Sequence, residues 1–210
     1  MTGDRRTGAA AERDARVREF KRELILDGAR TVFAERGLEG ASIRAIAAAA
    51  GCTTGAIYPY FSGKEEIYAE LLAESLETLR AELEAAAGGD LRSRLNQTAR
   101  AFFSFYRQRP GDLELGLYLF QGVRPRGLGR ELDRRLNAQL AAALAVIRAP
   151  LAELAGSDVT ASVELAALFT WLTGLLIVEH TGRIKVVEAT ADPLLDHYLD
   201  ALLVRLEGTR

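Results

Sequence analysis

The stretch from Ala41 to Ile67 restricts the possible folds more than any other part of this chain. It reads ASIRAIAAAAGCTTGAIYPYFSGKEEI, and Ser42 stands where a helix N-cap is expected. The residues that follow on one helix face are all apolar: Ile43, Ile46, Ala47 and Ala50. Gly51 can end this helix, because glycine adopts a positive φ without strain. The stretch therefore predicts a short helix that is followed at once by a sharp turn.

A second short helix is predicted directly after the turn, capped by a threonine. Two helices that cross steeply need a small residue where they touch, a glycine in the turn and an aliphatic side chain beyond it. Ala47, Gly51 and Ile57 fill these three places. Phe61 lies one helical turn after Ile57 and is also expected inside. The segment 42–64 is thus predicted to form a helix-turn-helix, a motif that binds DNA.

Two longer helices are predicted on either side of this motif. Before it, apolar residues at helical spacing indicate a helix over 17–36, which Gly37 ends. After it, Ser62 and Glu65 have the spacing of a capping box. They open a helix that continues to the glycine pair at 88–89.

The remaining sequence also predicts helices. Ala, Leu, Glu and Arg are abundant, only five prolines occur, and period-two alternation is hard to find. Asp90 and Asp192 stand where N-caps are expected, and Pro193 suits a first helical turn. Further helices are predicted over about 90–107, 112–121, 130–154, 159–181 and 193–207. The fold class is therefore all-α.

Three parts are expected along the chain. A flexible N-terminal arm covers 1–16, the helix-turn-helix DNA-binding domain covers 17–64, and a larger helical domain covers 65–210. Residues 1–64 hold 11 Lys and Arg against 8 Asp and Glu, whereas residues 65–210 hold 16 against 21. A mildly basic N-terminal part followed by an acidic C-terminal part suits a protein that binds nucleic-acid phosphates through its N-terminal part.

Several other classes of protein are disfavoured by the residue types present. Cys52 is the only cysteine, so no disulfide can form within the chain. Its small apolar side chain is expected to pack in the turn, with thiol sensing as the alternative. His180 and His197 are the only histidines, and no residue set for a metal, a cofactor or catalysis is visible. The apolar run 165–178 is too short to cross a bilayer, and no secretory signal is visible. A soluble cytoplasmic protein that is no enzyme is expected.

The segment GASIRAIAAAAGCTTGAIYPYFSGKEEIYAELL, which begins at Gly40, resembles the DNA-binding segment of TetR-family transcriptional regulators. The preceding helix with Phe33 and Gly37 fits the same pattern, so the resemblance covers roughly residues 20–72. The residues in register are Ala47, Gly51, Gly55, Ile57, Tyr58, Tyr60, Phe61, Lys64 and Glu65. The resemblance implies a homodimeric repressor that a small-molecule effector releases from its operator DNA.

The resemblance also implies which residues meet DNA: Ser42, Arg44, Thr53, Thr54, Gly55, Tyr58, Tyr60 and Lys64. The residues from Thr53 to Gly55 would begin the recognition helix, and Tyr58 and Tyr60 would face the duplex. Lys64 would meet phosphate together with the first amides of its own helix.

Pro59 is a departure from the family pattern, which more often has an aromatic or polar residue at this position. Proline has no N–H to donate to the carbonyl of Gly55 one turn earlier. We therefore expect a tightened last turn in the recognition helix, and the family's base contact at this position does not carry over.

The helical body is expected to bind the effector and to form the dimer. The helices over 159–181 and 193–207 are apolar around most of their surface, so a four-helix seam between two copies would bury them. Aromatic residues in excess of the core stripes predict a pocket for a hydrophobic or aromatic ligand: Phe103, Tyr106, Tyr118 and Trp171. Two alternatives stay open, a helical-bundle enzyme that imitates the motif and an architectural DNA-binding dimer without a ligand.

Overall fold

The structure is a computed structural model that describes residues 4–117 and 127–208, with side chains from residue 12 onward. Every regular element in these ranges is a helix, which confirms the all-α fold class. The chain divides into two compact units. Unit 1 comprises Met1–Leu72 and Tyr118–Leu132, and unit 2 comprises Ala73–Leu117 and Asp133–Arg210.

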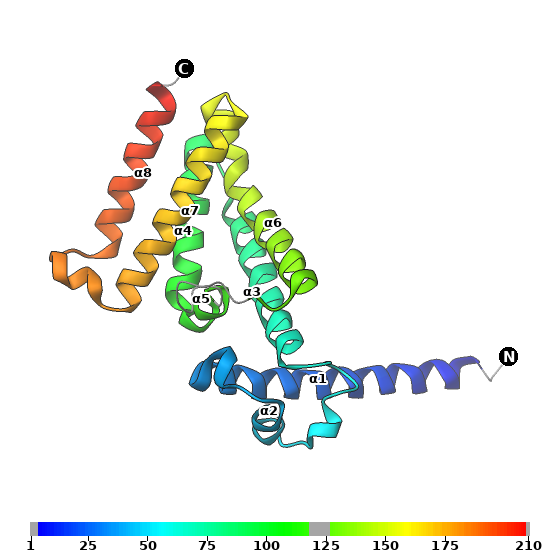
Figure 1. The fold of residues 1–210 in the computed structure, drawn as a ribbon. Coiled ribbons are helices and arrows are strands. Elements are labelled where there is room, and N and C mark those ends of the chain that lie inside the picture. Colours follow the sequence, from blue (N-terminus) through cyan, green and yellow to red (C-terminus); the bar gives the residue numbers. More distant parts are fainter. Residues whose placement is uncertain (1–3, 118–126, 209–210) are drawn as a thin grey trace. The chain divides into compact units, whose positions relative to one another are not determined.

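Helix α1 (Asp4–Gly40) begins unit 1 and is longer than the predicted helix over 17–36 (Figure 1). The stretch 1–16, expected to be a flexible arm, is therefore mostly helical. It is rich in Ala and Arg, which are strong helix formers. The side chains over 12–20 are all exposed, so no apolar face marks this part of the helix in the sequence. Helical geometry is interrupted at Gly37, with a φ of 63°, where the sequence predicts the end of the helix.

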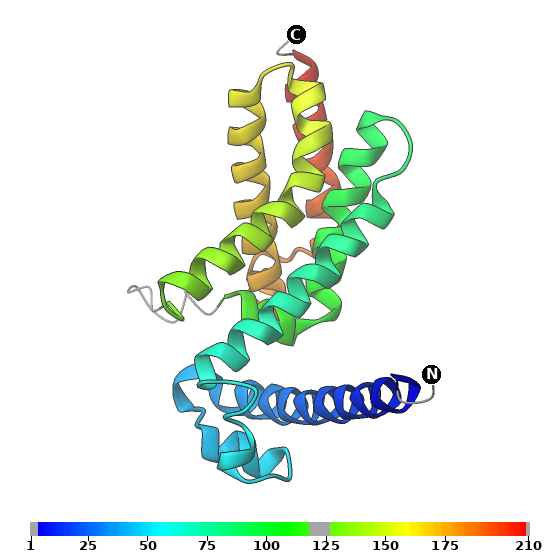
Figure 2. The same ribbon diagram turned by 90° about the vertical axis from the view of Figure 1, so that its right-hand side faces the viewer.

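Unit 1 is built on the packing of α1 against α2 (Ile43–Ala49), which lies across it (Figures 1 and 2). The buried apolar side chains are those of Ile25, Ala29, Val32 and Phe33 on α1 and of Ile46 and Ala47 on α2. Ile43 and Ala50, which the sequence predicts on the same face of α2, are half-buried. At Gly28 the backbones come close, since a Cβ there would lie 2.7 Å from the backbone nitrogen of Ala50. The crossing of α1 and the end of α2 thus depends on a residue without a side chain.

Helix α3 (Lys64–Ala86) begins in unit 1 and continues into unit 2. The buried side chains of its first turns are those of Ile67, Tyr68 and Leu71. The ring of Tyr68 meets the ring of Phe33 on α1 edge-on, with the centroids 5.0 Å apart. Unit 1 therefore extends to Leu72, beyond the end at residue 64 that the sequence suggests for the DNA-binding domain.

The start of α3 differs in detail from the predicted capping box. Lys64 is the first helical residue, so Gly63 takes the cap position, and its carbonyl accepts an amide from the following turn at 3.3 Å. Glu66 is then the third helical residue, and its carboxylate accepts from the amide and the hydroxyl of Ser62 at 2.6 and 2.7 Å. The predicted pairing of Ser62 with Glu65 is wrong, because the helix begins one residue later than that pairing requires.

Unit 2 contains the rest of α3, most of α6, and the other described helices that follow α3. These are α4 (Leu91–Gln108), α5 (Pro110–Gly116), α6 (Arg130–Ala155), α7 (Asp158–His180), the 3-10 helix η3 (Arg183–Val187) and α8 (Ala191–Gly208). Asp90 caps α4 as predicted, since its carboxylate accepts from the Ser93 amide at 2.8 Å. This hydrogen bond lowers the pKa of the Asp90 carboxyl. The helix expected over 112–121 begins at Pro110, and its predicted end lies outside the described residues.

Helix α4 supplies much of the core of unit 2 and packs against α5, α7 and α8 (Figure 1). A stripe at helical spacing is buried at Leu95, Thr98, Phe102 and Phe105. Thr98 is fully buried, and its hydroxyl donates to the carbonyl of Arg94 at 2.7 Å. The buried hydroxyl therefore keeps a hydrogen-bond partner within the helix.

Gly28→Ala is expected to destabilise the protein by about 1–3 kcal/mol, because the added methyl group would overlap the backbone of Ala50. Chemical denaturation followed by circular dichroism measures the loss. Gly111→Ala in α5 is the matched control, since a Cβ at this helical glycine meets nothing within 4 Å. The control should be neutral or slightly stabilising. A Gly28→Ala variant as stable as the wild type would contradict the close contact.

Candidate DNA-binding site

Between α2 and α3 the chain forms the 3-10 helix η1 (Thr54–Ala56) and a further turn, in place of the predicted short α-helix. The amides of Ile57 and Tyr60 donate to carbonyls three residues back, at 3.2 and 2.9 Å. Pro59 accounts for part of this difference, because it has no N–H to donate to Gly55. The tightening that was expected only in the last turn therefore extends over the whole element.

The turn before η1 has the conformation that the sequence predicts. Gly51 has a φ of 66°, and the amide of Cys52 donates to the carbonyl of Ala47 at 2.9 Å, which closes the end of α2. Ile57 and Phe61 are 0% and 4% exposed, so both point inward as predicted. Their burial leaves the opposite side of the segment to solvent.

That outward side carries most of the residues expected at DNA. Its exposed members are Ser42, Arg44, Thr53, Thr54, Gly55 and Tyr58. Tyr58 is 60% exposed, whereas Tyr60 is half-buried, with the guanidinium of Arg18 5.9 Å from its ring centroid. The Ser42 hydroxyl accepts from the Ala45 amide at 3.2 Å and so caps α2 as predicted. The helix-turn-helix thus presents polar and aromatic groups that its own core does not use.

Gly55 lies on this outward side, and the fold itself does not require a glycine there. A Cβ at this position would come no closer than 4.0 Å to the nearest heavy atom, the hydroxyl oxygen of Thr53. The φ of Gly55 also lies outside the left-handed region. An alanine would therefore fit the protein, and the lack of a side chain leaves room for a partner that approaches the backbone closely.

Lys64, which the resemblance assigns to phosphate, directs its ammonium group toward the last turn of α1 and the residue that follows it. Its Nζ donates to the carbonyls of Leu38 and Ala41 at 2.8 and 3.1 Å. The carbonyl of Glu39 lies 3.4 Å from the same nitrogen. The side chain is half-buried. Its charge is therefore already surrounded by backbone oxygens of unit 1.

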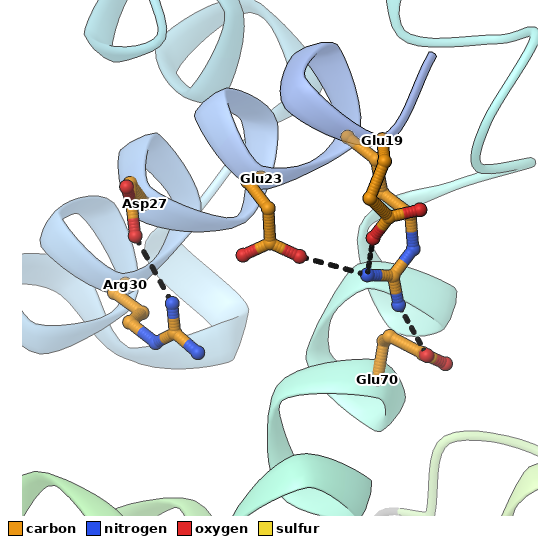
Figure 3. Close-up of polar contacts among 6 residues, drawn as sticks. Glu19, Glu23, Asp27, Arg30 and Glu70 are labelled. Atoms are coloured by element: carbon orange, nitrogen blue, oxygen red, sulfur yellow. Dashed lines mark hydrogen bonds and ion pairs between the residues drawn. The ribbon is translucent and has the colours of Figure 1, made fainter. Parts of the chain in front are cut away.

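A charged cluster around Arg22 ties α1 to the first turns of α3 (Figure 3). The guanidinium of Arg22 pairs with Glu19 and Glu23 on its own helix at 3.3 and 3.0 Å, and with Glu70 on α3. It also lies 5.9 Å from the ring centroid of Phe61. The sequence shows the helical spacing of Glu19 and Arg22, but no signal in it pairs Arg22 with Glu70. This cluster is absent from the sequence predictions.

Two of the four aromatic residues expected to line a ligand pocket lie in the core of unit 2. Phe103 and Tyr106 are 1% and 5% exposed. Tyr106 packs edge-on against Phe102 and Phe105, with centroid distances of 5.1 and 5.0 Å, and burial raises its pKa. Residues outside the main stripe of α4 are buried because α5, α7 and α8 cover this helix on several sides.

The other two residues give no evidence for the predicted pocket. Trp171 is half-buried and stacks on Tyr198 with the centroids 4.2 Å apart, and Tyr118 lies outside the described residues. A cleft of ≈ 390 Å³ lies between α3 and α6, lined by Leu76, Glu77, Arg80, Arg135, Ala138, Gln139 and Ala142. The side-chain oxygen of Gln139 is buried without a hydrogen-bond partner among the described residues. This mixed lining suits a molecule that has both charged and apolar parts.

Helix α7 exposes a stripe of small and apolar residues. Only 28% of its most apolar 18-residue stretch is buried, and by length and composition alone α6 and α7 could cross a membrane. The exposed residues of α7 between its charged ends are Val159, Ser162, Val163, Ala166, Ala167, Thr170, Gly174 and Ile177. This side of α7 has no cover within the described parts of the chain.

Helix α8 is covered more fully than its sequence suggests. Its buried residues include Leu195, Leu199, Leu202 and Leu206. Its exposed residues include Asp196, His197 and Asp200, and among its large apolar residues Val204 is 66% exposed. Most of the apolar surface of α8 is therefore already buried inside unit 2.

Residues 25–71, which span the end of α1, the helix-turn-helix and the start of α3, match the model of the bacterial regulatory proteins of the tetR family. Over 92 residues the chain is 35% identical to the HTH-type transcriptional repressor KstR2 of Rhodococcus jostii (strain RHA1). That match covers 44% of this chain and 45% of KstR2. The chain thus spans less than half the length of this curated relative.

Solved structures resemble a larger part of the chain. A putative transcriptional regulator of Pseudomonas aeruginosa PAO1 is 25% identical with a TM-score of 0.69, and the match covers 90% of this chain and 91% of that one. The transcriptional regulator FadR of Bacillus subtilis, solved in complex with stearoyl-CoA, is 20% identical with a TM-score of 0.68 and coverages of 86% and 97%. The family model and the curated repressor thus match this chain over its DNA-binding segment, and the solved structures show a fold that is shared over most of its length.

Proposed function

We propose that this protein is a sequence-specific DNA-binding transcriptional repressor, which acts in the cytoplasm as a homodimer and leaves its operator when a small-molecule effector binds. The observation that carries the proposal is the outward face of the helix-turn-helix. Gly55 is not required by the fold, and Arg44 and Tyr58 of the same motif are exposed. An exposed glycine lets a duplex approach the backbone, and an exposed arginine can meet a phosphate.

In this proposal η1 enters the major groove with its first residues toward the bases. Thr53 and Thr54 supply hydroxyl groups for base edges or phosphates, and Gly55 lets the backbone approach the duplex. Tyr58 contacts the DNA beside them, and Arg44 on α2 meets a phosphate. Tyr60 stands at the rim of this face, since its ring is half-buried beside Arg18.

The dimer is proposed to form chiefly through α7. Its exposed stripe is uncharged and mostly apolar, and a Cβ at Gly174 would meet nothing within 4 Å, so a helix of a second copy can approach closely. Burial of such a surface is favourable at about 25 cal/mol per Å². α8 would flank this seam with its polar exposed side and not form its centre.

The effector is proposed to bind in the cleft between α3 and α6. Arg80 and Arg135 line the cleft with guanidinium groups, and an anion would compete with Glu77 for Arg80, which this carboxylate contacts at 2.8 Å. Leu76, Ala138 and Ala142 offer apolar surface. FadR of Bacillus subtilis holds stearoyl-CoA, a molecule that combines phosphates with an acyl chain. This makes an acyl-CoA the first probe to test here. α3 joins the cleft to the helix-turn-helix along one helix, because it contributes Leu76 to the cleft and Lys64 to unit 1.

Gly55→Ala is expected to leave thermal stability unchanged or slightly raised, because alanine fits the fold and restricts the unfolded chain. Its DNA binding should weaken by about 1–3 kcal/mol, since the methyl group would stand between the backbone and the duplex. Fluorescence anisotropy with a duplex selected from a random pool by the wild-type protein measures this change. Gly208→Ala, at an open position near the C-terminus, should bind as the wild type does. A Gly55→Ala variant with unchanged affinity would argue against this face.

Val163→Arg is expected to weaken the dimer by about 2 kcal/mol or more, because it places an unpaired charge in the apolar stripe of α7. Sedimentation equilibrium at several protein concentrations measures the dissociation constant. Val186→Arg on η3 is the matched control, since this valine is 78% exposed but lies off the stripe. A dimer that tolerates both substitutions equally would place the contact elsewhere.

Stearoyl-CoA is expected to bind about 5–150-fold more weakly when operator DNA is present, because binding of effector and operator must be linked reciprocally. Calorimetric titration with and without the selected duplex measures both affinities. Ala138→Trp should fill the cleft and abolish this binding, whereas Ala141→Trp, exposed on the same helix but outside the cleft lining, should not. Equal affinities in the two titrations would show that this molecule is no inducer.

A further inference from the structure

The ammonium group of Lys64 is held by the backbone at the end of α1 and by Ala41, which follows this helix. Its three carbonyl partners belong to Leu38, Glu39 and Ala41, at 2.8, 3.4 and 3.1 Å. An ammonium group has three N–H donors, so these three oxygens can use all of its hydrogen-bonding capacity. A phosphate oxygen would have to displace one of them.

The chemistry of the end of α1 explains why a cation is held at this place. The last carbonyls of a helix lack partners within the helix and carry a partial negative charge. Gly37 interrupts the helical geometry, so the carbonyls just after it cannot all be satisfied by a regular following turn. Lys64 therefore acts as a C-terminal cap for α1, supplied from a residue that is distant in the sequence.

This cap also fixes where α2 begins. Ala41, one of the three acceptors, directly precedes Ser42, the N-cap of α2. Lys64 is the first residue of α3, and Arg22 on α1 pairs with Glu70 further along the same helix (Figure 3). The start of α3 is thus tied to α1 at two places. The first of these, Lys64, also binds the carbonyl of Ala41, the residue just before the N-cap of α2.

We infer that Lys64 is a positioning residue that sets α2 and the recognition segment for DNA and does not itself bind phosphate. The inference rests on the proposed DNA-binding function. It differs from the role that the family resemblance suggests for this lysine, and Arg44 is left as the exposed cation of the helix-turn-helix. The two roles have different consequences for the salt dependence of binding, which allows a direct test.

The test compares Lys64→Met, Lys64→Arg and Arg44→Met. The slope of log affinity against log salt falls by about 0.9 for each phosphate contact that is lost, or about 1.8 for two copies in a dimer. Arg44→Met should show this fall. Lys64→Met should bind the selected duplex on the order of tenfold more weakly with the slope of the wild type, because the same phosphates are still met by a less ordered site. Lys64→Arg should weaken binding as well, since a planar guanidinium cannot point at three converging carbonyls.

Hydrogen exchange of the DNA-free protein gives an independent readout. Amides over 43–49 should exchange on the order of tenfold faster in both Lys64 variants and at the wild-type rate in Arg44→Met. A Lys64→Met slope lowered by about 1.8, or a Lys64→Arg variant that binds as the wild type does, would overturn the assignment. If the wild-type protein selects no duplex, the proposed function fails. The exchange rates then still decide whether Lys64 is a positioning residue, because unchanged rates in the Lys64 variants would refute that role.

Discussion

One continuous helix, α3, takes part in the cores of both units, and the rest of the structure depends on its register. It has 23 residues, so it is about 34 Å long. Ile67 and Leu71 are buried in unit 1, and Leu79 and Leu83 are buried in unit 2. A shift of one residue would turn every one of these side chains by about 100°. The apolar residues of α3 must therefore face two separate cores within one helical register.

Local signals in the sequence were sufficient for most of the architecture. Gly51 and the inward pair Ile57 and Phe61 lie as predicted, and Asp90 caps α4 as expected. Each of these features depends on residues within one or two helical turns of each other, so caps, glycines and apolar spacing reveal them directly. The outward side of the helix-turn-helix followed from the same reasoning, because residues that do not face the core must face solvent.

The features that could not be predicted depend on residues far apart in the chain. No local pattern shows that Lys64 meets the carbonyl of Leu38, or that Arg22 meets Glu70. The burial of Phe103 was missed for a related reason, since one apolar stripe was counted on a helix that other helices cover on several sides. The helical start of α1 was missed because an exposed helix has no apolar face to detect.

The stack of Trp171 on Tyr198 gives the chain an internal optical label. Trp171 is the only tryptophan, and its ring lies 4.2 Å from that of Tyr198 at an interplanar angle of 18°. Both residues belong to unit 2, so the emission of this indole reports the contact between α7 and α8 and is silent about unit 1. Far-ultraviolet dichroism, in contrast, sums the helices of both units. The two signals recorded on one sample therefore distinguish melting of the half that carries the helix-turn-helix from melting of the half that carries the cleft and the exposed stripe of α7.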